Sequence, residues 1–160
     1  MNELENIFEE LGFERKGVQL PEGAIVYALA RTYGLVMRRL AKVYKRFGLS
    51  AVSFNLLVLL QRGKDPGSLT QHAVSERLVV SPSDMTGLID RLQRKGLVRR
   101  VPGKDRRTNL LRITPRGTRV VDEAWPHHAE EIKRLCRILN GRETHVLARA
   151  LSGLRRSVAG

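Results

Sequence analysis

The sequence contains a single cysteine, Cys136, so it cannot form an intramolecular disulfide. It also lacks any uninterrupted apolar run that approaches the roughly 20 residues needed to span a bilayer. The first residues, MNELE, are acidic where a secretory signal would be basic. These absences predict a cytoplasmic protein of a reducing compartment, with no disulfide framework and no membrane partner.

Motifs that carry enzyme or metal chemistry are also missing from the sequence. There is no phosphate-binding glycine loop, no nucleophile elbow and no clustered pair of carboxylates. His127 and His128 are adjacent, so they point to different sides of a helix, unlike the i, i+4 pair that chelates a metal on one face. We therefore expect no enzyme activity, no metal site and no cofactor.

Acidic residues are scarce relative to basic ones: 16 Asp and Glu stand against 29 Lys and Arg, and the formal net charge is +13. So large an excess repels itself unless a polyanionic partner offsets it, and nucleic acid is the first candidate. An anionic membrane surface or an arginine-rich proteome would account for the same count. The 160 residues, 42% of them hydrophobic, otherwise fit one soluble globular domain with a real core.

The position of the charges favours nucleic acid. Residues 1–23 carry a net charge of −4, whereas residues 91–119 carry +10, which is most of the excess of the whole chain. The cations of this second region are Arg91, Arg94, Lys95, Arg99, Arg100, Lys104, Arg106, Arg107, Arg112, Arg116 and Arg119. Such a concentration is typical of a surface that faces a phosphate backbone, and a solvated face without a partner is the alternative.

Apolar spacing and helix-breaking residues divide the chain into helices and one hairpin. The expected helices are a short one ended by Gly12, then 24–47, about 50–61, 71–78, 83–95, 115 to about 139 with a break or kink near Pro126, and 142–158. Two β-prone runs, 97–101 and 110–114, flank a polar, cationic tip and predict a β-hairpin. The order helix, helix, hairpin is that of a winged helix-turn-helix.

The helix that follows Ser81 has a complete start signal. Ser81 is the expected N-cap, Pro82 takes the first helical position and Asp84 completes a capping box. The apolar stripe of this helix consists of Met85, Leu88, Ile89 and Leu92. Small polar residues near its N-terminus, followed by cations, suit insertion into the DNA major groove, and an ordinary amphipathic surface helix is the alternative.

The tip of the hairpin carries Lys104, Arg106 and Arg107, which are placed to reach the negative potential of an adjacent minor groove. In the alternative interpretation one of the two arginines pairs with Asp105 or with Asp90. It then holds the hairpin against the preceding helix.

The stretch from Leu69 to Thr114 resembles the DNA-binding core of the MarR (multiple antibiotic resistance regulator) family. The string LTQHAVSERLVVSPSDMTGLIDRLQRKGLVRR is similar to the helix-turn-helix of that family, and KDRRTNLLRIT is similar to its wing. GLSAVSFNLLVLL resembles the helix that precedes them, so the resemblance covers about residues 24–158. It implies a mainly α protein with a small β-hairpin wing, an α+β winged helix-turn-helix whose N- and C-terminal helices intertwine in a homodimer.

The resemblance also implies binding of double-stranded DNA at a pseudo-palindromic site. Carried over by position, the residues that face the major groove are Ser81, Ser83, Thr86, Gly87 and Arg91, with the cation Arg94 behind them. Thr70 and Gln71 meet phosphates, and the wing consists of Lys104, Asp105, Arg106 and Arg107. Two positions depart from the family pattern, because Gly87 replaces a longer, often basic side chain and Val79 replaces a turn glycine.

Many members of the family release DNA when a small aromatic ligand enters a cleft between the dimerisation helices and the DNA-binding lobe. The candidates on the expected walls of that cleft are Tyr44, Phe54, Trp125, His127 and His128, for which core packing is the alternative. Cys136 is expected to be a buried structural thiol. A redox switch is the alternative, which the cationic neighbours Lys133, Arg134 and Arg137 keep open without favouring it.

Together these observations predict a dimeric MarR-type DNA-binding transcription regulator, acting by repression or activation. Its expected parts are an acidic N-terminal extension (1–23) that packs on the partner subunit, dimerisation helices (24–48 and 115–160) and a winged helix-turn-helix DNA-binding region (49–114). The alternative is a sequence-indifferent nucleic-acid-binding or chromatin protein, which the positive charge alone would permit.

Overall fold

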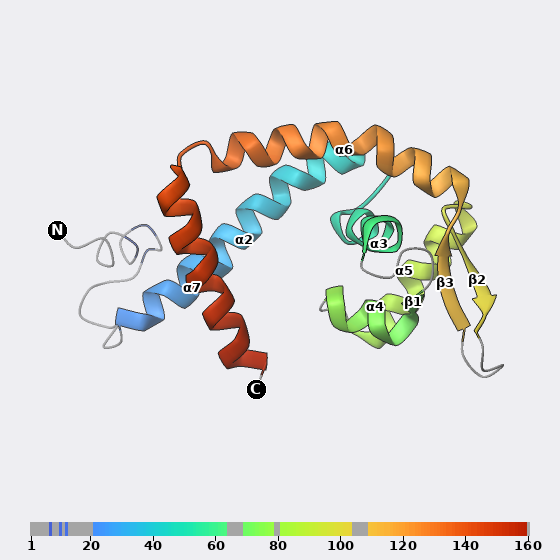
Figure 1. Cartoon of the computed structure of the whole chain (residues 1–160), viewed down its shortest axis with the longest axis horizontal. Helices are drawn as coiled ribbons and strands as arrows, with labels where there is room; N and C mark the ends of the chain where they lie inside the picture. The colour runs from blue at the N-terminus through green and yellow to red at the C-terminus, as the bar shows by residue number, and fades with distance from the viewer. Residues whose placement is uncertain are drawn as a thin grey trace.

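The computed structural model describes residues 21–63, 69–78, 81–103 and 109–159, together with Ile7, Glu10 and Gly12. The elements, in chain order, are α2 (Pro21–Lys45), α3 (Ala51–Arg62), β1 (Leu69–Thr70), α4 (Gln71–Leu78), α5 (Pro82–Arg94), β2 (Val98–Pro102), β3 (Asn109–Ile113), α6 (Pro115–Cys136) and α7 (Gly141–Ala159) (Figure 1). The predicted order is confirmed, with most boundaries shifted by a few residues. The structure is mainly α with one small sheet.

The core surrounds α3, which lies between the long helices and the sheet (Figure 1). Phe54, Leu56, Leu57 and Leu60 of this helix are fully buried. The helix begins at a local signal, because the side chain of Ser50 accepts a hydrogen bond from the backbone N–H of Ser53 at 3.1 Å. This nearly uniformly apolar helix therefore lies at the centre of the core.

A second layer is formed by α2 and α6, which pack against each other and against α3. An ion pair between Arg39 and Glu131, with 2.7 Å between Nε and Oε1, joins the two long helices. Of the predicted break or kink near Pro126, the break does not occur, because α6 continues through this proline. Proline removes one backbone hydrogen bond, and the packing of the adjacent turns against α2 and α3 holds the helix together despite that loss.

The sheet has the strand order β1-β3-β2, and both pairings are antiparallel. In the hairpin Val98 pairs with Ile113 and Pro102 with Asn109, while Leu69 of β1 pairs with Leu111. β1 was not predicted, because two residues are too few to produce an alternating pattern. The hairpin packs beside α5, and α4 and α5 precede it, so this part of the chain is a winged helix-turn-helix.

The sheet joins α6 at a close approach of two backbones. A Cβ atom on Gly117 would lie 2.2 Å from the carbonyl oxygen of Leu97 and 2.8 Å from Cγ1 of Ile113. Only glycine fits there. The side chain of Thr114 caps α6 by accepting from the N–H of Gly117 at 3.0 Å and also donates to the carbonyl of Gly96 at 2.7 Å.

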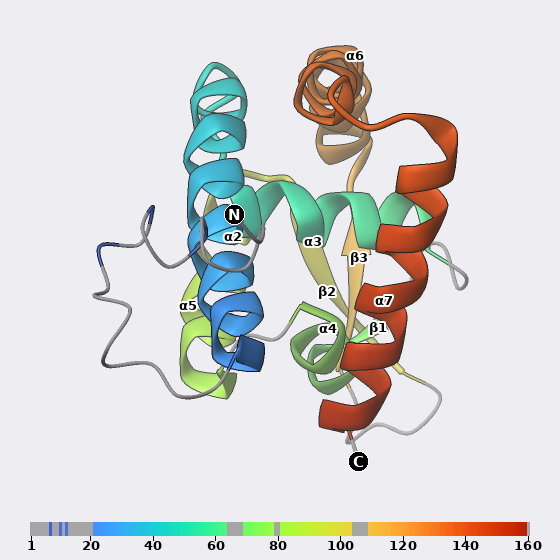
Figure 2. The ribbon, with the colours of Figure 1, turned by 90° about the vertical axis from the view of Figure 1, so that its left-hand side faces the viewer.

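The last helix, α7, has no extensive packing contact with another described element. Figure 2 shows that it lies apart from α2. The helix carries an apolar stripe that is exposed, at Val146, Leu147, Leu151, Leu154 and Val158. The first half of α2 likewise exposes Ile25, Val26, Tyr27, Leu29, Tyr33 and Leu35.

Cys136, at the end of α6, is exposed, so the prediction of a buried structural thiol is wrong. Ile132 and Leu135 of the same helix are partly buried against the core, whereas Cys136 lies on the exposed side of its last turn. Of the predicted N-terminal helix, Ile7 and Glu10 are helical and Gly12 adopts a left-handed turn conformation (φ +77°), while its other residues lie outside the described part of the chain. None of the described helices is both long and apolar enough to cross a bilayer.

Candidate nucleic-acid interface

The start of α5 is fixed by the residues that the sequence singled out. The Ser81 hydroxyl oxygen accepts a hydrogen bond from the backbone N–H of Asp84 at 3.2 Å and donates to Oδ2 of Asp84 at 2.6 Å. The Ser83 hydroxyl lies 3.1 Å from that of Ser81. The predicted N-cap is confirmed, although the Asp84 carboxylate takes the Ser81 hydroxyl where the usual capping box uses the backbone N–H.

The two faces of α5 differ sharply in burial. Met85, Leu88, Ile89 and Leu92 are each 3% exposed or less, which confirms the predicted stripe. The opposite face is exposed and carries Ser83, Thr86, Asp90, Arg91 and Arg94. The helix therefore binds the core on one side and offers polar and cationic side chains on the other.

Two candidate residues from different helices contact each other directly. Gln71 at the start of α4 donates from Nε2 to the Thr86 hydroxyl of α5 at 2.8 Å. The Thr70 hydroxyl caps α4 by accepting from the backbone N–H of Ala73 at 3.1 Å. The first bond joins the two helices of the helix-turn-helix and the second fixes the start of α4, so Gln71 and Thr70 have structural roles there.

The hairpin is tied to α5 by a residue outside the predicted site. Arg100 of β2 donates from Nη2 to Oδ1 of Asp90 and from Nη1 to Oε1 of Gln93, both at 2.7 Å. The sequence could have indicated this arginine, because a period of two places it on the same face of β2 as the buried Val98. The predicted hairpin-tip residues, Lys104, Asp105, Arg106 and Arg107, lie outside the described part of the chain.

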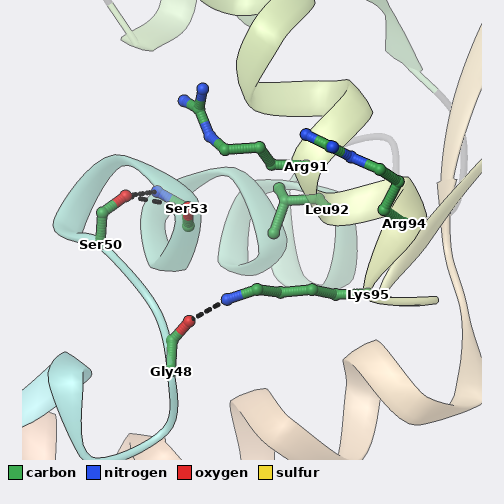
Figure 3. Close-up of a pocket in the computed structure, with 7 residues that line it drawn as sticks. All are labelled: Gly48, Ser50, Ser53, Arg91, Leu92, Arg94 and Lys95. Carbon is green, nitrogen blue, oxygen red and sulfur yellow. Dashed lines mark hydrogen bonds between the residues drawn. The ribbon is translucent and has the colours of Figure 1, made fainter.

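The C-terminal end of α5 is tied to the α2–α3 turn. Lys95 donates from Nζ to the carbonyl oxygen of Gly48 at 2.6 Å (Figure 3). Gly96 then ends the helix with a positive φ of +69°, a conformation that favours glycine. Arg91 and Arg94 extend from the same end of the helix, and neither forms an ion pair with another described residue (Figure 3).

Gly87 lies on α5 at the position where the family resemblance predicts a longer side chain. A Cβ atom built on it would have one close neighbour, Nη1 of Arg91 at 3.4 Å. The guanidinium of Arg91 therefore extends back along the helix over Gly87. The absence of a side chain at position 87 leaves room for that path.

The cations outside α5 are also exposed. They are Arg99 in β2, Arg112 in β3 and both Arg116 and Arg119 in the first turns of α6. With Arg91, Arg94 and Lys95 they place most of the described part of the 91–119 charge excess at the surface. Such a surface can bind a polyanion through its phosphates.

The aromatic candidates gather in one cluster between α2, α3 and α6. Tyr44 stacks on Phe54 with ring centroids 4.3 Å apart, and its hydroxyl lies 2.9 Å from Nδ1 of His128. The centroids of the Trp125 and His128 rings lie 5.3 Å apart. The Arg62 guanidinium lies over the Trp125 ring, 4.3 Å from its centroid. His127 is separate, beside Phe47 at 5.6 Å. The two histidines therefore face different sides, as predicted.

Burial changes the acid–base properties of this cluster. It raises the pKa of Tyr44 to about 12, because the phenolate would be desolvated. It lowers the pKa of His128, because the imidazolium would be desolvated. At neutral pH the hydrogen bond thus joins a neutral phenol and a neutral imidazole, and the tautomer of His128 decides which of the two donates. The rings fill the space between them, so the cluster is packed as core.

Comparison with known proteins places this geometry in a family. The family model of the MarR family matches residues 47–108. The HTH-type transcriptional regulator PecS of Dickeya dadantii (strain 3937) is 28% identical over 153 residues, covering 94% of this chain and 91% of PecS. The HTH-type transcriptional regulator YkoM of Bacillus subtilis (strain 168) is 32% identical over 106 residues, covering 66% of this chain and 67% of YkoM.

A solved structure extends the likeness to the fold. CouR from Rhodococcus jostii RHA1, solved bound to p-coumaroyl-CoA, is 26% identical, with a TM-score of 0.74 and coverage of 86% of this chain and 95% of CouR. The family match spans the α2–α3 turn, both helices of the helix-turn-helix and the first strand of the wing, and PecS is similar along nearly the whole chain. The order of a capped helix followed by a wing agrees with these matches. The chain therefore belongs to the MarR family and is a transcription regulator, not an enzyme.

Proposed function

We propose that this regulator binds a pseudo-palindromic DNA operator as a homodimer, with α5 in the major groove and the basic wing in the minor groove. The observation that carries the proposal is the arrangement of α5. The helix is capped by Ser81, packed on the core through one face, and tied by Arg100 to the wing and by Lys95 to the α2–α3 turn. A helix held at both ends keeps its exposed face in register with base edges.

The proposed contacts follow from position along α5. The residues that face base edges are Ser81, Ser83, Thr86, Gly87 and Arg91, while Arg94, Thr70 and Gln71 meet phosphates. Lys104, Asp105, Arg106 and Arg107 form the wing tip. The hydroxyl oxygens of Ser81 and Ser83 lie 3.1 Å apart at the helix start and present acceptors together, while the Ser81 proton is donated to Asp84.

The proposed partner of the exposed apolar faces is a second copy of this chain. α7 is 19 residues long and exposes its whole apolar stripe, and the first half of α2 does the same. A helix with an unpacked apolar face is poorly stabilised in water by its own propensity. Mutual burial of α2 and α7 by two copies removes both faces from water. The proposed division is therefore dimerisation helices at 24–48 and 115–160, with DNA binding at 49–114 and the acidic extension 1–23 on the partner.

A salt-series titration tests the proposal. Duplexes drawn from promoter regions and random duplexes of equal length are titrated at several salt concentrations. We expect one palindromic duplex to bind at least about 1,000-fold more tightly than random DNA. Equal binding of all duplexes would instead establish the second candidate, a sequence-indifferent nucleic-acid-binding protein, which the net charge of +13 favours.

Two single substitutions test the orientation on DNA. Arg91→Ala and Arg107→Ala each remove one cation, from α5 and from the wing respectively. Each should weaken operator binding by about 1–3 kcal/mol if its guanidinium contacts a base. Unchanged affinity in both variants would show that the interface lies elsewhere on the molecule.

We also propose a small aromatic effector that binds at the cluster of Tyr44, Phe54, Trp125 and His128. CouR, which shares the fold, was solved with p-coumaroyl-CoA bound. Here the rings contact one another, so a ligand must displace them and thereby alter the packing of α6 on α2. Trp125 is the only tryptophan and reports binding by its fluorescence. With p-coumaroyl-CoA and p-coumarate as probes, a saturable fluorescence change with loss of operator affinity supports the proposal, and no change with either probe contradicts it.

A further inference from the structure

A cavity of about 430 Å³ lies between the C-terminal end of α5 and the start of α3. Its lining includes Arg91, Arg94 and Lys95 at the end of α5, and Gly48, Ser50 and Ser53 of the α2–α3 turn and the start of α3 (Figure 3). Its volume lies within the range of small-molecule sites. It is separate from the aromatic cluster, none of whose rings lines it.

The lining of this cavity has one sign of charge. Three of its seven lining residues are cations, and none is acidic. The two serine hydroxyls hydrogen-bond each other at 2.9 Å, which leaves one hydroxyl proton to donate at the first turn of α3, where the helix dipole also favours an anion. A site with this lining is complementary to an oxyanion and repels cations.

The cations differ in how they are held. Lys95 is anchored on the Gly48 carbonyl at 2.6 Å, which fixes one side of the cavity. Arg91 and Arg94 have no carboxylate partner among the described residues, so their guanidinium donors are available to a ligand. Three like charges around one space repel one another, and a bound anion would relieve that repulsion.

We propose that this cavity is an oxyanion-binding site, recognised by Arg91, Arg94, Lys95 and the Ser50–Ser53 pair. The ligand group is a phosphate or a carboxylate. It comes either from a free small molecule or from the backbone of bound DNA, and both sources offer the same chemistry to the guanidinium groups. Only the DNA source rests on the proposed function, so the two sources are tested separately.

The first arm of the experiment uses inorganic phosphate as the probe. The full-length ¹⁵N-labelled protein is titrated with phosphate at constant ionic strength, and the amide shifts of Gly48, Ser53 and Leu92 are followed. Arg94→Gln and Lys95→Gln should each weaken a saturable response about tenfold, as expected for the loss of one charge-assisted hydrogen bond. The matched control is Arg99→Gln, which removes the same charge from exposed β2 outside the cavity.

The second arm measures the affinity for duplex DNA over a salt series with the same variants. If a backbone phosphate fills the cavity, Arg94→Gln and Lys95→Gln lower the slope of log affinity against log salt by about one, and by more than Arg99→Gln does. Bound duplex then also abolishes the phosphate-induced shifts.

The outcomes separate cleanly. Saturable phosphate shifts that only the cavity variants weaken support a site for a free anion, even if no operator is found. A cavity-specific change of the salt slope without saturable phosphate binding supports the DNA backbone as the source. If neither response appears, or if Arg99→Gln matches the cavity variants in both arms, the inference is overturned.

Discussion

The guanidinium of Arg100 in β2 lies 2.7 Å from Oδ1 of Asp90 in α5, and a second hydrogen bond of the same length joins it to Gln93. The wing and the proposed recognition helix are therefore connected by one side chain. Two bonds from a planar guanidinium restrict both distance and angle, which a single bond does not.

Arg100→Ala should reduce operator affinity about tenfold, because the wing loses its fixed position relative to α5. The stability of the fold should change by less than about 1 kcal/mol, since the side chains of Arg100 and Asp90 are 31% and 50% exposed. Arg99→Ala, the adjacent cation on the same strand, controls for the lost charge. Titration of operator DNA and denaturant unfolding measure the two effects. Equal affinity losses in both variants would show that charge and not position is responsible.

Ser81→Ala should lower the free energy of unfolding by about 1 kcal/mol, because the N–H of Asp84 loses its cap. Ser83→Ala is the control, since its hydroxyl contacts Ser81 without capping a described backbone N–H. Urea unfolding of both variants at the same protein concentration makes the comparison. A loss for Ser83→Ala as large as that for Ser81→Ala would argue against the cap as the cause.

The two glycines Gly87 and Gly117 should respond in opposite directions to alanine. Gly87→Ala should raise the free energy of unfolding by roughly 0.5–1 kcal/mol, because a methyl group there meets only the flexible end of Arg91 and alanine is the better helix former. Gly117→Ala should destabilise by about 1–3 kcal/mol or more, because the new atom would collide with the Leu97 carbonyl. Thermal unfolding of both variants tests this, and a shift of the same sign in both would contradict the geometry.

The stability should depend on pH through His128. Since burial lowers the pKa of His128 in the folded state, the unfolded chain takes up the proton first as the pH falls through the ordinary value of 6.5. The free energy of unfolding should therefore decrease below that pH, and the decrease should end once the pH passes the folded-state pKa. Unfolding of wild type and His128→Gln at several pH values should show a weaker dependence in the variant. His127→Gln, an exposed neighbour, should keep the wild-type slope; if it loses that slope while His128→Gln keeps it, the assignment is wrong.

Tyr44 should make the free energy of unfolding decrease at alkaline pH. Its folded-state pKa of about 12 exceeds the ordinary value of 10.0, so its contribution to stability is complete below pH 10 and is lost as the pH rises towards 12. Tyr44→Phe should remove this loss, although the variant also gives up the hydrogen bond to His128.

The proposed dimer should depend on the exposed stripe of α7. Leu151→Glu places a charge on this apolar face and should shift the protein to monomers in sedimentation experiments, because a buried unpaired carboxylate opposes association. Arg149→Glu, on the polar side of the same helix, changes the charge by more and should leave the dimer intact. A monomeric wild type would refute the dimer itself.

Much of the fold could be predicted from the sequence because its signals are local. The cap at Ser81, the stripe from Met85 to Leu92 and the positive-φ glycine Gly96 each act within a few residues, and all three are present in the structure. β1 and the unbroken α6 could not be predicted, because they depend on partners distant in sequence. The same is true of Arg100, whose role depends on how β2 lies against α5.

The sequence by itself determined the order of the helices and the hairpin, which residues carry the charge excess and which chain segment resembles a regulator, since these follow from neighbouring residues and composition. Only the tertiary structure decided that Tyr44, Phe54, Trp125 and His128 pack together, that Cys136 is exposed, and that Lys95 meets Gly48 beside an unpaired group of arginines. Contacts between residues tens of positions apart depend on how whole helices pack, and no local pattern encodes that packing.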